Sequence, residues 1–179
     1  MDVTLETRRL VLRPPHPADA RRMASFLDNF AVSGNLSRVP YPYRLADARD
    51  YLARWQKDAP AEETNFVIDL DGECCVGQIG FHGDAFGPVV GYWLAQPFWS
   101  RGLMSEAARA AIAWYFETTG ALELRSGVFH FNRASLAIQR KLGFVETGIS
   151  MRHCLARGEQ VRHIDTILTR AAWAERDGQ

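Results

Sequence analysis

The residues best suited to do chemistry lie in one stretch, 98–107, which reads Phe-Trp-Ser-Arg-Gly-Leu-Met-Ser-Glu-Ala. The stretch joins an apolar, strand-like run over 89–95 to a helical pattern that continues to about Thr119. First-turn N–H groups of a helix lack intrahelical partners and carry partial positive charge, so they can bind an anion. Gly102 lets a phosphate approach the backbone closely, and Arg101 can add a charge-assisted contact. The pattern therefore predicts a phosphate site here, with an ordinary strand-to-helix turn as the alternative.

A second polar segment lies further along the chain and reads Asn-Arg-Ala-Ser over 132–135, then Arg-Lys-Leu-Gly-Phe over 140–144. Together the two segments resemble the signature segments of the GNAT superfamily of acyl-CoA-dependent N-acetyltransferases. The residues over 91–95 and 98–107, and the run Thr-Arg-Arg-Leu-Val-Leu-Arg-Pro over 7–14, are similar to its RimJ/RimL-like branch. The resemblance covers nearly the whole chain, with the motifs in the expected order.

The resemblance implies that acetyl-CoA binds as cosubstrate, with its pyrophosphate on the backbone amides of the segment 99–104. The chain keeps the motif's central glycine and its basic residue, but the first and last positions depart from the family pattern. A main-chain N–H near Leu94 is expected to polarise the acetyl carbonyl. The residues expected to bind acetyl-CoA are Trp93, Leu94, Arg101, Gly102, Leu103, Met104, Ser105, Asn132, Ser135 and Lys141. Core packing is the alternative for Trp93, and a solvated charge is the alternative for Lys141.

The resemblance also implies a proton donor. It places the hydroxyl of Ser135 beside the sulfur of coenzyme A, where the hydroxyl could protonate the leaving thiolate. Many members of the superfamily use a tyrosine four residues before the Gly-Phe pair, and here that position is Gln139, which cannot act as an acid. The acid role therefore falls to Ser135 or to water. A solvated serine near the Asn132 helix cap is the alternative.

The general base has two candidates. An amine near neutral pH is mostly protonated and must lose a proton before it attacks. Many relatives carry a glutamate where this chain has Val89, and ribosomal-protein members carry one where it has Cys154. His153 stands beside that second position and His82 follows the third strand, so both are candidate bases of suitable pKa. A structural role is the alternative for each histidine.

Other reactive side chains are expected to be structural. Glu106 falls in the first turn of a helix, where the dipole alone favours an acid. His163 and Asp165 are expected to pair on the last strand. Adjacent Cys74 and Cys75 are poor disulfide partners, and the three cysteines show no metal-ligand spacing. No metal site is therefore expected.

Hydrophobic periodicity and turn residues define the elements that must position these groups. Strands are expected over 5–13, 65–70, 73–81, 89–95, 122–129, 144–155 and 160–170, and helices over 17–31, 45–58, 102–119 and 132–142. This alternation predicts a mixed α/β fold, with a central twisted, mostly antiparallel sheet of about seven strands flanked by about four helices. The resemblance implies the same GNAT-like domain, with a sheet that opens after its fourth strand to admit the cofactor. The loop 33–44, with Tyr41, Tyr43 and Arg44, is expected to border the acceptor cleft.

Composition limits the remaining possibilities. A chain of 179 residues with 47% hydrophobic residues is expected to form a single domain over 1–179. A formal net charge of +0 argues against binding to nucleic acid or to an anionic membrane surface. No apolar run approaches the ~20 residues of a membrane helix, and residues 1–6 lack the form of a signal peptide. A cytoplasmic location is therefore expected.

The sequence thus predicts an enzyme that transfers the acetyl group of acetyl-CoA to a primary amine by direct attack. The acceptor is expected to be a protein N-terminus or a small amine. The alternative is a non-catalytic acyl-CoA-binding module or sensor, because Val89 and Gln139 replace two usual catalytic groups. No Gly-x-Gly-x-x-Gly follows a strand, which argues against a dinucleotide-binding protein.

Overall fold

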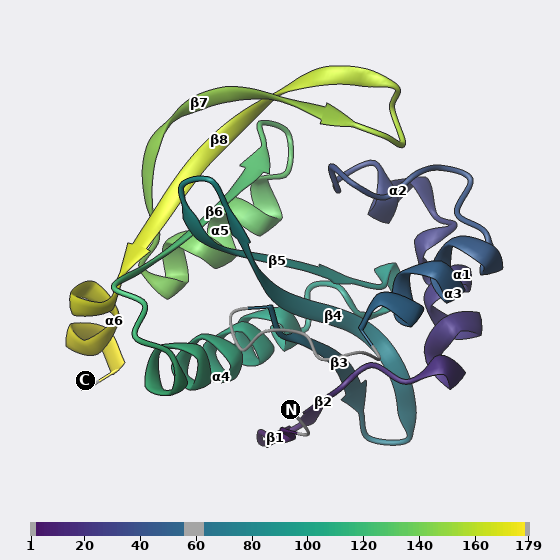
Figure 1. Ribbon diagram of the computed structural model, residues 1–179, viewed down its shortest axis with the longest axis horizontal. Coiled ribbons are helices and arrows are strands. Elements are labelled where there is room, and N and C mark those ends of the chain that lie inside the picture. Colours follow the sequence, from purple (N-terminus) through teal and green to yellow (C-terminus); the bar gives the residue numbers. More distant parts are fainter. Residues whose placement is uncertain (1–2, 56–62, 178–179) are drawn as a thin grey trace.

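The computed structural model describes residues 3–55 and 63–177, and these residues build one eight-stranded sheet with helices packed on it (Figure 1). The strands are β1 (Leu5–Glu6), β2 (Leu10–Arg13), β3 (Asn65–Leu70), β4 (Glu73–Asp84), β5 (Gly87–Leu94), β6 (Glu123–Phe129), β7 (Val145–Cys154) and β8 (Glu159–Thr169). The helices are α1 (Ala20–Leu27), α2 (Phe30–Ser33), α3 (Leu45–Arg54), α4 (Leu103–Thr118), α5 (Arg133–Leu142) and α6 (Arg170–Asp177). The mixed α/β prediction is confirmed.

The sheet opens between β5 and β6. Its strand order is β1-β2-β3-β4-β5-β6-β8-β7, and β5 with β6 is its parallel pair. These two strands are registered only at Val89 and Arg125, and the Ser126 hydroxyl donates to the Val90 carbonyl at 2.9 Å. Beyond this contact the strands separate toward their C-terminal ends. Parallel strands that lose their ladder in this way leave backbone groups free for a ligand.

Alternation along the strands divides the core into two layers. Phe66 and Ile68 of β3 pack with α4 in one buried cluster, whereas Val67 between them packs with α1 and α3 in another. Successive side chains of a strand point to opposite faces, so α4 covers one face and α1 and α3 cover the other. The antiparallel hairpin of β7 and β8 extends past the opening, and its turn contacts the segment after α2 (Figure 1). Leu155 N–H donates to the Ser37 carbonyl at 3.1 Å.

The structure corrects several expected boundaries. The strand expected over 5–13 is two strands, because the chain turns where Thr7 and Leu10 hydrogen-bond each other. The opening therefore follows the fifth strand rather than the fourth. The helix expected over 17–31 is broken at Asn29, whose side chain caps α2 by accepting from Ala31 N–H at 3.0 Å. Helix α3 ends at Arg54, and most of its expected extension to 58 lies outside the described residues.

A C-terminal helix was not expected, because the last strand was extended to residue 170. The strand ends at Thr169, and α6 follows directly. The Arg170 guanidinium donates to the carbonyls of Ala121 and Thr119 at 2.8 and 2.7 Å, and Trp173 is buried against Phe116. These contacts are long-range in sequence, so local patterns do not reveal them.

Candidate active site

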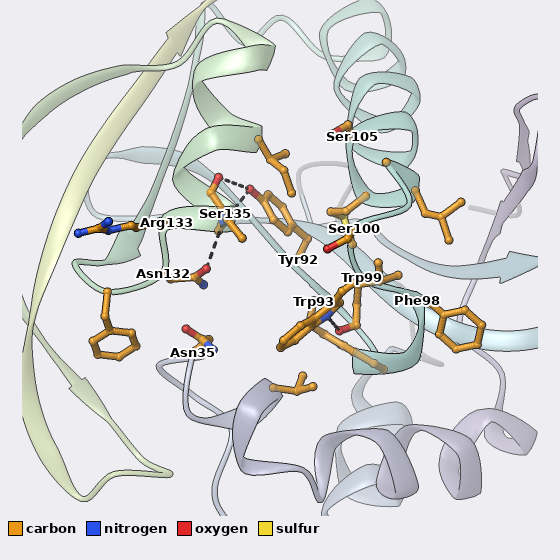
Figure 2. Close-up of a pocket in the computed structure, with 18 residues that line it drawn as sticks. Asn35, Tyr92, Trp93, Phe98, Trp99, Ser100, Ser105, Asn132, Arg133 and Ser135 are labelled. Carbon is orange, nitrogen blue, oxygen red and sulfur yellow. Dashed lines mark hydrogen bonds between the residues drawn. The ribbon is translucent and has the colours of Figure 1, made fainter.

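The sheet opening leads into a pocket of about 610 Å³ (Figure 2). Its walls come from the end of β5, the turn before α4, the start of α5 and the segment after α2. Its lining residues include Tyr92, Trp99, Ser100, Gly102, Asn132 and Ser135. Pockets that bind small molecules typically span about 300–1,000 Å³, so this one has room for an extended ligand.

The turn before α4 presents free backbone amides to this pocket. Gly102 is the N-cap of α4 with a φ of 73°, and no side chain caps the helix. The first helical hydrogen bond at this end joins Glu106 N–H to the Gly102 carbonyl at 3.1 Å, so the amides of residues 103–105 precede the helical ladder. A Cβ at position 102 would meet only the Arg9 guanidinium at 3.6 Å. The left-handed backbone rather than lack of space therefore favours glycine here.

Glu106 fastens this turn to the first strands. Its carboxylate accepts from Thr7 Oγ1 at 2.7 Å, from Arg9 N–H at 2.9 Å and from Arg9 Nε at 2.7 Å. Arg9 also donates to the Arg101 carbonyl at 2.9 Å. Burial alone would raise the pKa of Glu106, but the hydrogen bonds from Thr7 and Arg9 and the charge of Arg9 lower it below its usual value. Glu106, which was expected only to interact favourably with the helix dipole, thus anchors the turn.

A pair of hydroxyl groups, from Tyr92 and Ser135, lies in the wall of the pocket between β5 and α5 (Figure 2). Tyr92 of β5 places its hydroxyl 3.0 Å from Ser135 Oγ and 3.4 Å from the Ser135 carbonyl oxygen. Asn132 caps α5 as expected, and its Oδ1 accepts from the backbone N–H of Ser135 at 3.1 Å. The Ser135 hydroxyl is therefore not used by the cap. It is free to serve the pocket.

Tyr92 is a candidate that sequence reasoning missed. Burial raises its pKa to about 12, although the hydrogen bonds of Ser135 and Gln139 partly oppose the shift. The hydroxyl is therefore protonated at neutral pH and can donate. Tyr92 shares one face of β5 with Leu94, two residues on, and that alternation was the available signal.

Gln139 has a structural role next to the Tyr92–Ser135 pair. Its Nε2 donates to Ser126 Oγ at 2.9 Å, and its Oε1 accepts from Thr166 Oγ1 at 2.8 Å. The side chain is 1% exposed. It ties α5 to β6 and β8, and its amide offers no ionisable proton for catalysis.

A second, smaller cavity of about 100 Å³ lies between β5 and β6. Tyr92, Asn132 and Ser135 line both cavities. His163 of β8 lines the smaller one, and its Nδ1 lies 2.8 Å from Asp165 Oδ1, which confirms the expected pairing of these two residues. Burial lowers the pKa of His163, while the hydrogen bond and charge of Asp165 oppose that effect.

The expected acetyl-CoA residues fall into two groups. Those that line the large pocket are Trp93, Leu94, Gly102, Leu103, Met104, Ser105, Asn132 and Ser135. Arg101 and Lys141 do not line it, and both are exposed. The Arg101 guanidinium lies 5.8 Å from the centre of the Phe98 ring. Trp93 also has a core role, because its indole N–H donates to the buried Gln78 side chain at 3.2 Å.

The two histidines expected as bases lie apart from both cavities. His153 is exposed on β7 opposite Gln160. His82 of β4 lies against the Arg38 guanidinium, with Nη2 at 2.8 Å from its Nε2. Burial and the charge of Arg38 lower the pKa of His82. Neither side chain contributes to the walls of the pockets.

The residues expected to bind the acceptor also lie outside the cavity walls. Tyr43 is buried in the core with α1 and α3, and burial raises its pKa. Tyr41 packs edge-on against Phe30, and Arg44 is the N-cap of α3. The part of the loop that does line the cavities is its beginning, at residues 35–37.

Cys154 is the residue that the family resemblance aligns with a glutamate of ribosomal-protein members. It is fully buried, and its Sγ lies 3.5 Å from the Leu36 carbonyl and 3.8 Å from the Gly34 carbonyl. Among residues 3–55 and 63–177, no three His, Cys, Asp or Glu side chains converge as a metal site would require. Within the same residues, no helix has the length and apolar character needed to cross a membrane.

Comparisons with known proteins agree with this architecture. Residues 9–145 match the family model of the acetyltransferase (GNAT) domain. The ribosomal protein uS5-alanine N-acetyltransferase of Escherichia coli K12 is 27% identical over 184 residues, which cover 96% of this chain and 93% of the relative. Mycobacterium smegmatis RimJ in complex with CoA-disulfide has a TM-score of 0.81 at 22% identity, covering 95% of this chain and 88% of that one. The ribosomal-protein-S5-alanine acetyltransferase of Vibrio fischeri also has a TM-score of 0.81, at 19% identity, with 96% and 99% covered. The chain therefore belongs to the GNAT acetyltransferase family, as its two signature segments predict.

Proposed function

We propose that this enzyme transfers the acetyl group of acetyl-CoA to a primary amine, either the α-amine of a protein N-terminus or a small amine. The observation that carries the proposal is the Tyr92–Ser135 hydroxyl pair, which lines a large pocket where the sheet opens. The name of the Escherichia coli relative specifies an alanine of a ribosomal protein, which favours a protein N-terminus as acceptor. A ribosomal acceptor would also place the enzyme in the cytoplasm.

The pocket fits the parts of acetyl-CoA. The amides of residues 103–105 and the glycine at 102 suit a pyrophosphate, which needs donors and close backbone approach. The apolar lining residues Val32, Phe98 and Ile138 suit the less polar pantetheine arm. The thioester would then reach the Tyr92–Ser135 hydroxyl pair.

The residues present can assist direct transfer. The neutral amine attacks the thioester carbonyl, a C–N bond forms, the nitrogen gives up one proton to water, and the C–S bond of the tetrahedral intermediate breaks. The Ser135 hydroxyl, supported by Tyr92, donates a proton to the departing sulfur and is reprotonated from water. Because a thiol has a pKa near 8.5, this donation is helpful rather than indispensable. Holding both reactants together removes the need for a covalent enzyme intermediate.

Thiol release from acetyl-CoA, measured over a panel of amines, tests the proposal. The panel contains peptides that begin with alanine or serine, a free amino acid, a polyamine and a peptide whose only amine is a lysine side chain. We expect turnover with at least one amine well above acetyl-CoA hydrolysis. Acetyl-CoA binding by calorimetry without turnover on any amine would instead support the sensor, which the replaced residues Val89 and Gln139 had suggested.

A further inference from the structure

The smaller cavity crosses the sheet and is lined from both of its faces. Gln139 reaches it from α5, on the face where Thr166 of β8 hydrogen-bonds the same glutamine. His163 and Asp165 are odd-numbered neighbours of Thr166 on β8, so their side chains point to the opposite face. The Tyr92–Ser135 pair lies on the α5 side. A group on each face can therefore act on one molecule held in the opening.

His163 is held in one orientation. Its Nδ1 lies 2.8 Å from Asp165 Oδ1, and the same oxygen accepts from Ser150 Oγ at 3.0 Å. The Phe129 ring meets the imidazole edge-on at 5.8 Å between centroids. A Cβ at Gly127 would lie 2.2 Å from His163 Cε1, so the glycine clears the space that the ring fills. The imidazole is thus positioned from β6, β7 and β8 together.

The pairing of His163 Nδ1 with Asp165 leaves the other ring nitrogen, Nε2, available to a ligand. A carboxylate only accepts hydrogen bonds, so Nδ1 carries the proton and Nε2 carries the lone pair. Among residues 3–55 and 63–177, no group hydrogen-bonds Nε2 of His163. The cavity is large enough to hold several water molecules beside it. His163 and Ser135 therefore line the same small cavity.

We propose that His163 is the general base that deprotonates the acceptor ammonium group, directly or across one water molecule, in the opening between β5 and β6. The inference rests on the proposed function, which it deepens. Nε2 takes one proton from the ammonium group, and the neutral amine attacks the thioester carbonyl. The second amine proton passes to water as the C–N bond forms, while the sulfur gains one from the Ser135 hydroxyl, which regains a proton from water. The imidazolium then releases its proton to solvent, so one proton is released in each turnover.

Burial, rather than the charges around the ring, favours the neutral form of His163. Burial is the largest influence and lowers the pKa of His163, the positive charge of Arg152 on β7 lowers it further, and Asp165 on β8 opposes both. The β6 residues against the ring, 126–129, carry no charge, and neither does Gln139 of α5. Tyr92 of β5 stays protonated because its pKa is about 12. At neutral pH the ring can therefore accept a proton.

The pH dependence of kcat tests the assignment, with an alanine-initiated peptide as the acceptor probe. His163→Gln is expected to lower kcat about 10–100-fold at pH 7, with the deficit shrinking toward pH 9. An α-amine has a pKa of about 7.7–8.0 and loses its proton unaided at that pH. Two further variants should shift the acidic limb of the kcat profile in opposite directions. Asp165→Asn should move the acidic limb to lower pH, and Arg152→Gln should move it to higher pH.

His130→Gln is the matched control, because His130 is exposed, contacts the Arg162 carbonyl and lines neither cavity. Its profile should match the wild type. Melting temperature and acetyl-CoA binding establish that each variant is folded, and if His163→Gln is not, the exposed Arg152→Gln decides the question. An unmoved acidic limb in the folded variants overturns the assignment, as does loss of that limb in His153→Gln. A wild-type enzyme that binds acetyl-CoA but acetylates no amine refutes the proposed function itself, and the assignment falls with it.

Discussion

The Ser135→Ala variant separates a catalytic hydroxyl from a structural one. The helix cap of α5 uses the backbone N–H of Ser135, which Asn132 Oδ1 accepts at 3.1 Å, so truncating the side chain leaves the cap in place. Within residues 3–55 and 63–177, the one side-chain hydrogen bond that the change removes is the bond to the Tyr92 hydroxyl at 3.0 Å. Tyr92 keeps the longer contact of 3.4 Å to the Ser135 carbonyl.

The expected magnitudes follow from these contacts. One hydrogen bond between neutral groups contributes about 0.5–1.5 kcal/mol, so the free energy of unfolding should fall by no more than that. A general acid typically contributes 10²–10⁴-fold to a rate. The thiolate is already a fair leaving group because a thiol pKa is near 8.5, so the loss in kcat should be only about 10–100-fold. The KM for acetyl-CoA should change little.

The assay combines steady-state thiol release with urea unfolding. Tyr92→Phe removes the other half of the pair, and a double variant tests whether the two hydroxyls act as one unit. If they do, the double variant should be no slower than the slower single variant. Asn132→Ala is the stability control, since loss of an N-cap side chain costs about 0.5–2 kcal/mol. Wild-type kcat in folded Ser135→Ala would refute the proton-donor role.

Three further changes address the framework of the site. Gly102→Val should weaken acetyl-CoA binding tenfold or more by calorimetry, equal to about 1.4 kcal/mol, and should also lower stability because a φ of 73° strains a branched residue. Glu106→Gln should lower the free energy of unfolding by about 1–2 kcal/mol at pH 7. Because the folded-state pKa of Glu106 is lowered, its contribution is present above the unfolded value of about 4.3 and is lost on acidification, so the variant's melting temperature should fall less between pH 5 and pH 3. Asp19→Ala should cost about 1.5–3 kcal/mol in urea unfolding, because Asp19 is 5% exposed and bonds Arg13 at two points, although Asp69 still pairs with Arg13 after its removal.

The features that sequence predicted well are those fixed by neighbouring residues. Gly102 at the start of α4 and Asn132 at the start of α5 are local signals, since a left-handed residue and a capping side chain act within one helical turn. The opening of the sheet beside β5 is not local, and its expectation came from the family resemblance rather than from periodicity.

The features that sequence reasoning missed depend on distant partners. Glu106 was expected to serve the dipole of its own helix, yet its partners Thr7 and Arg9 are 97 or more residues away. Tyr92 was treated as a core residue, yet its hydroxyl meets Ser135 across 43 residues. Such contacts form only when the sheet and α5 are assembled, so no local pattern encodes them.

The proposed base role of His153 depended on a different signal, and strand geometry argues against it. His153 was considered because it is next to Cys154, the position that the family resemblance aligned with a glutamate. Neighbouring residues of a strand point to opposite faces, so a residue that replaces an inward-facing group cannot be its immediate neighbour. The structure has Cys154 buried and His153 exposed. A replacement base must come from another strand at a similar depth, and β8 supplies it: His163 lies between Phe129 of β6 and Ser150 of β7, on the wall of the smaller cavity.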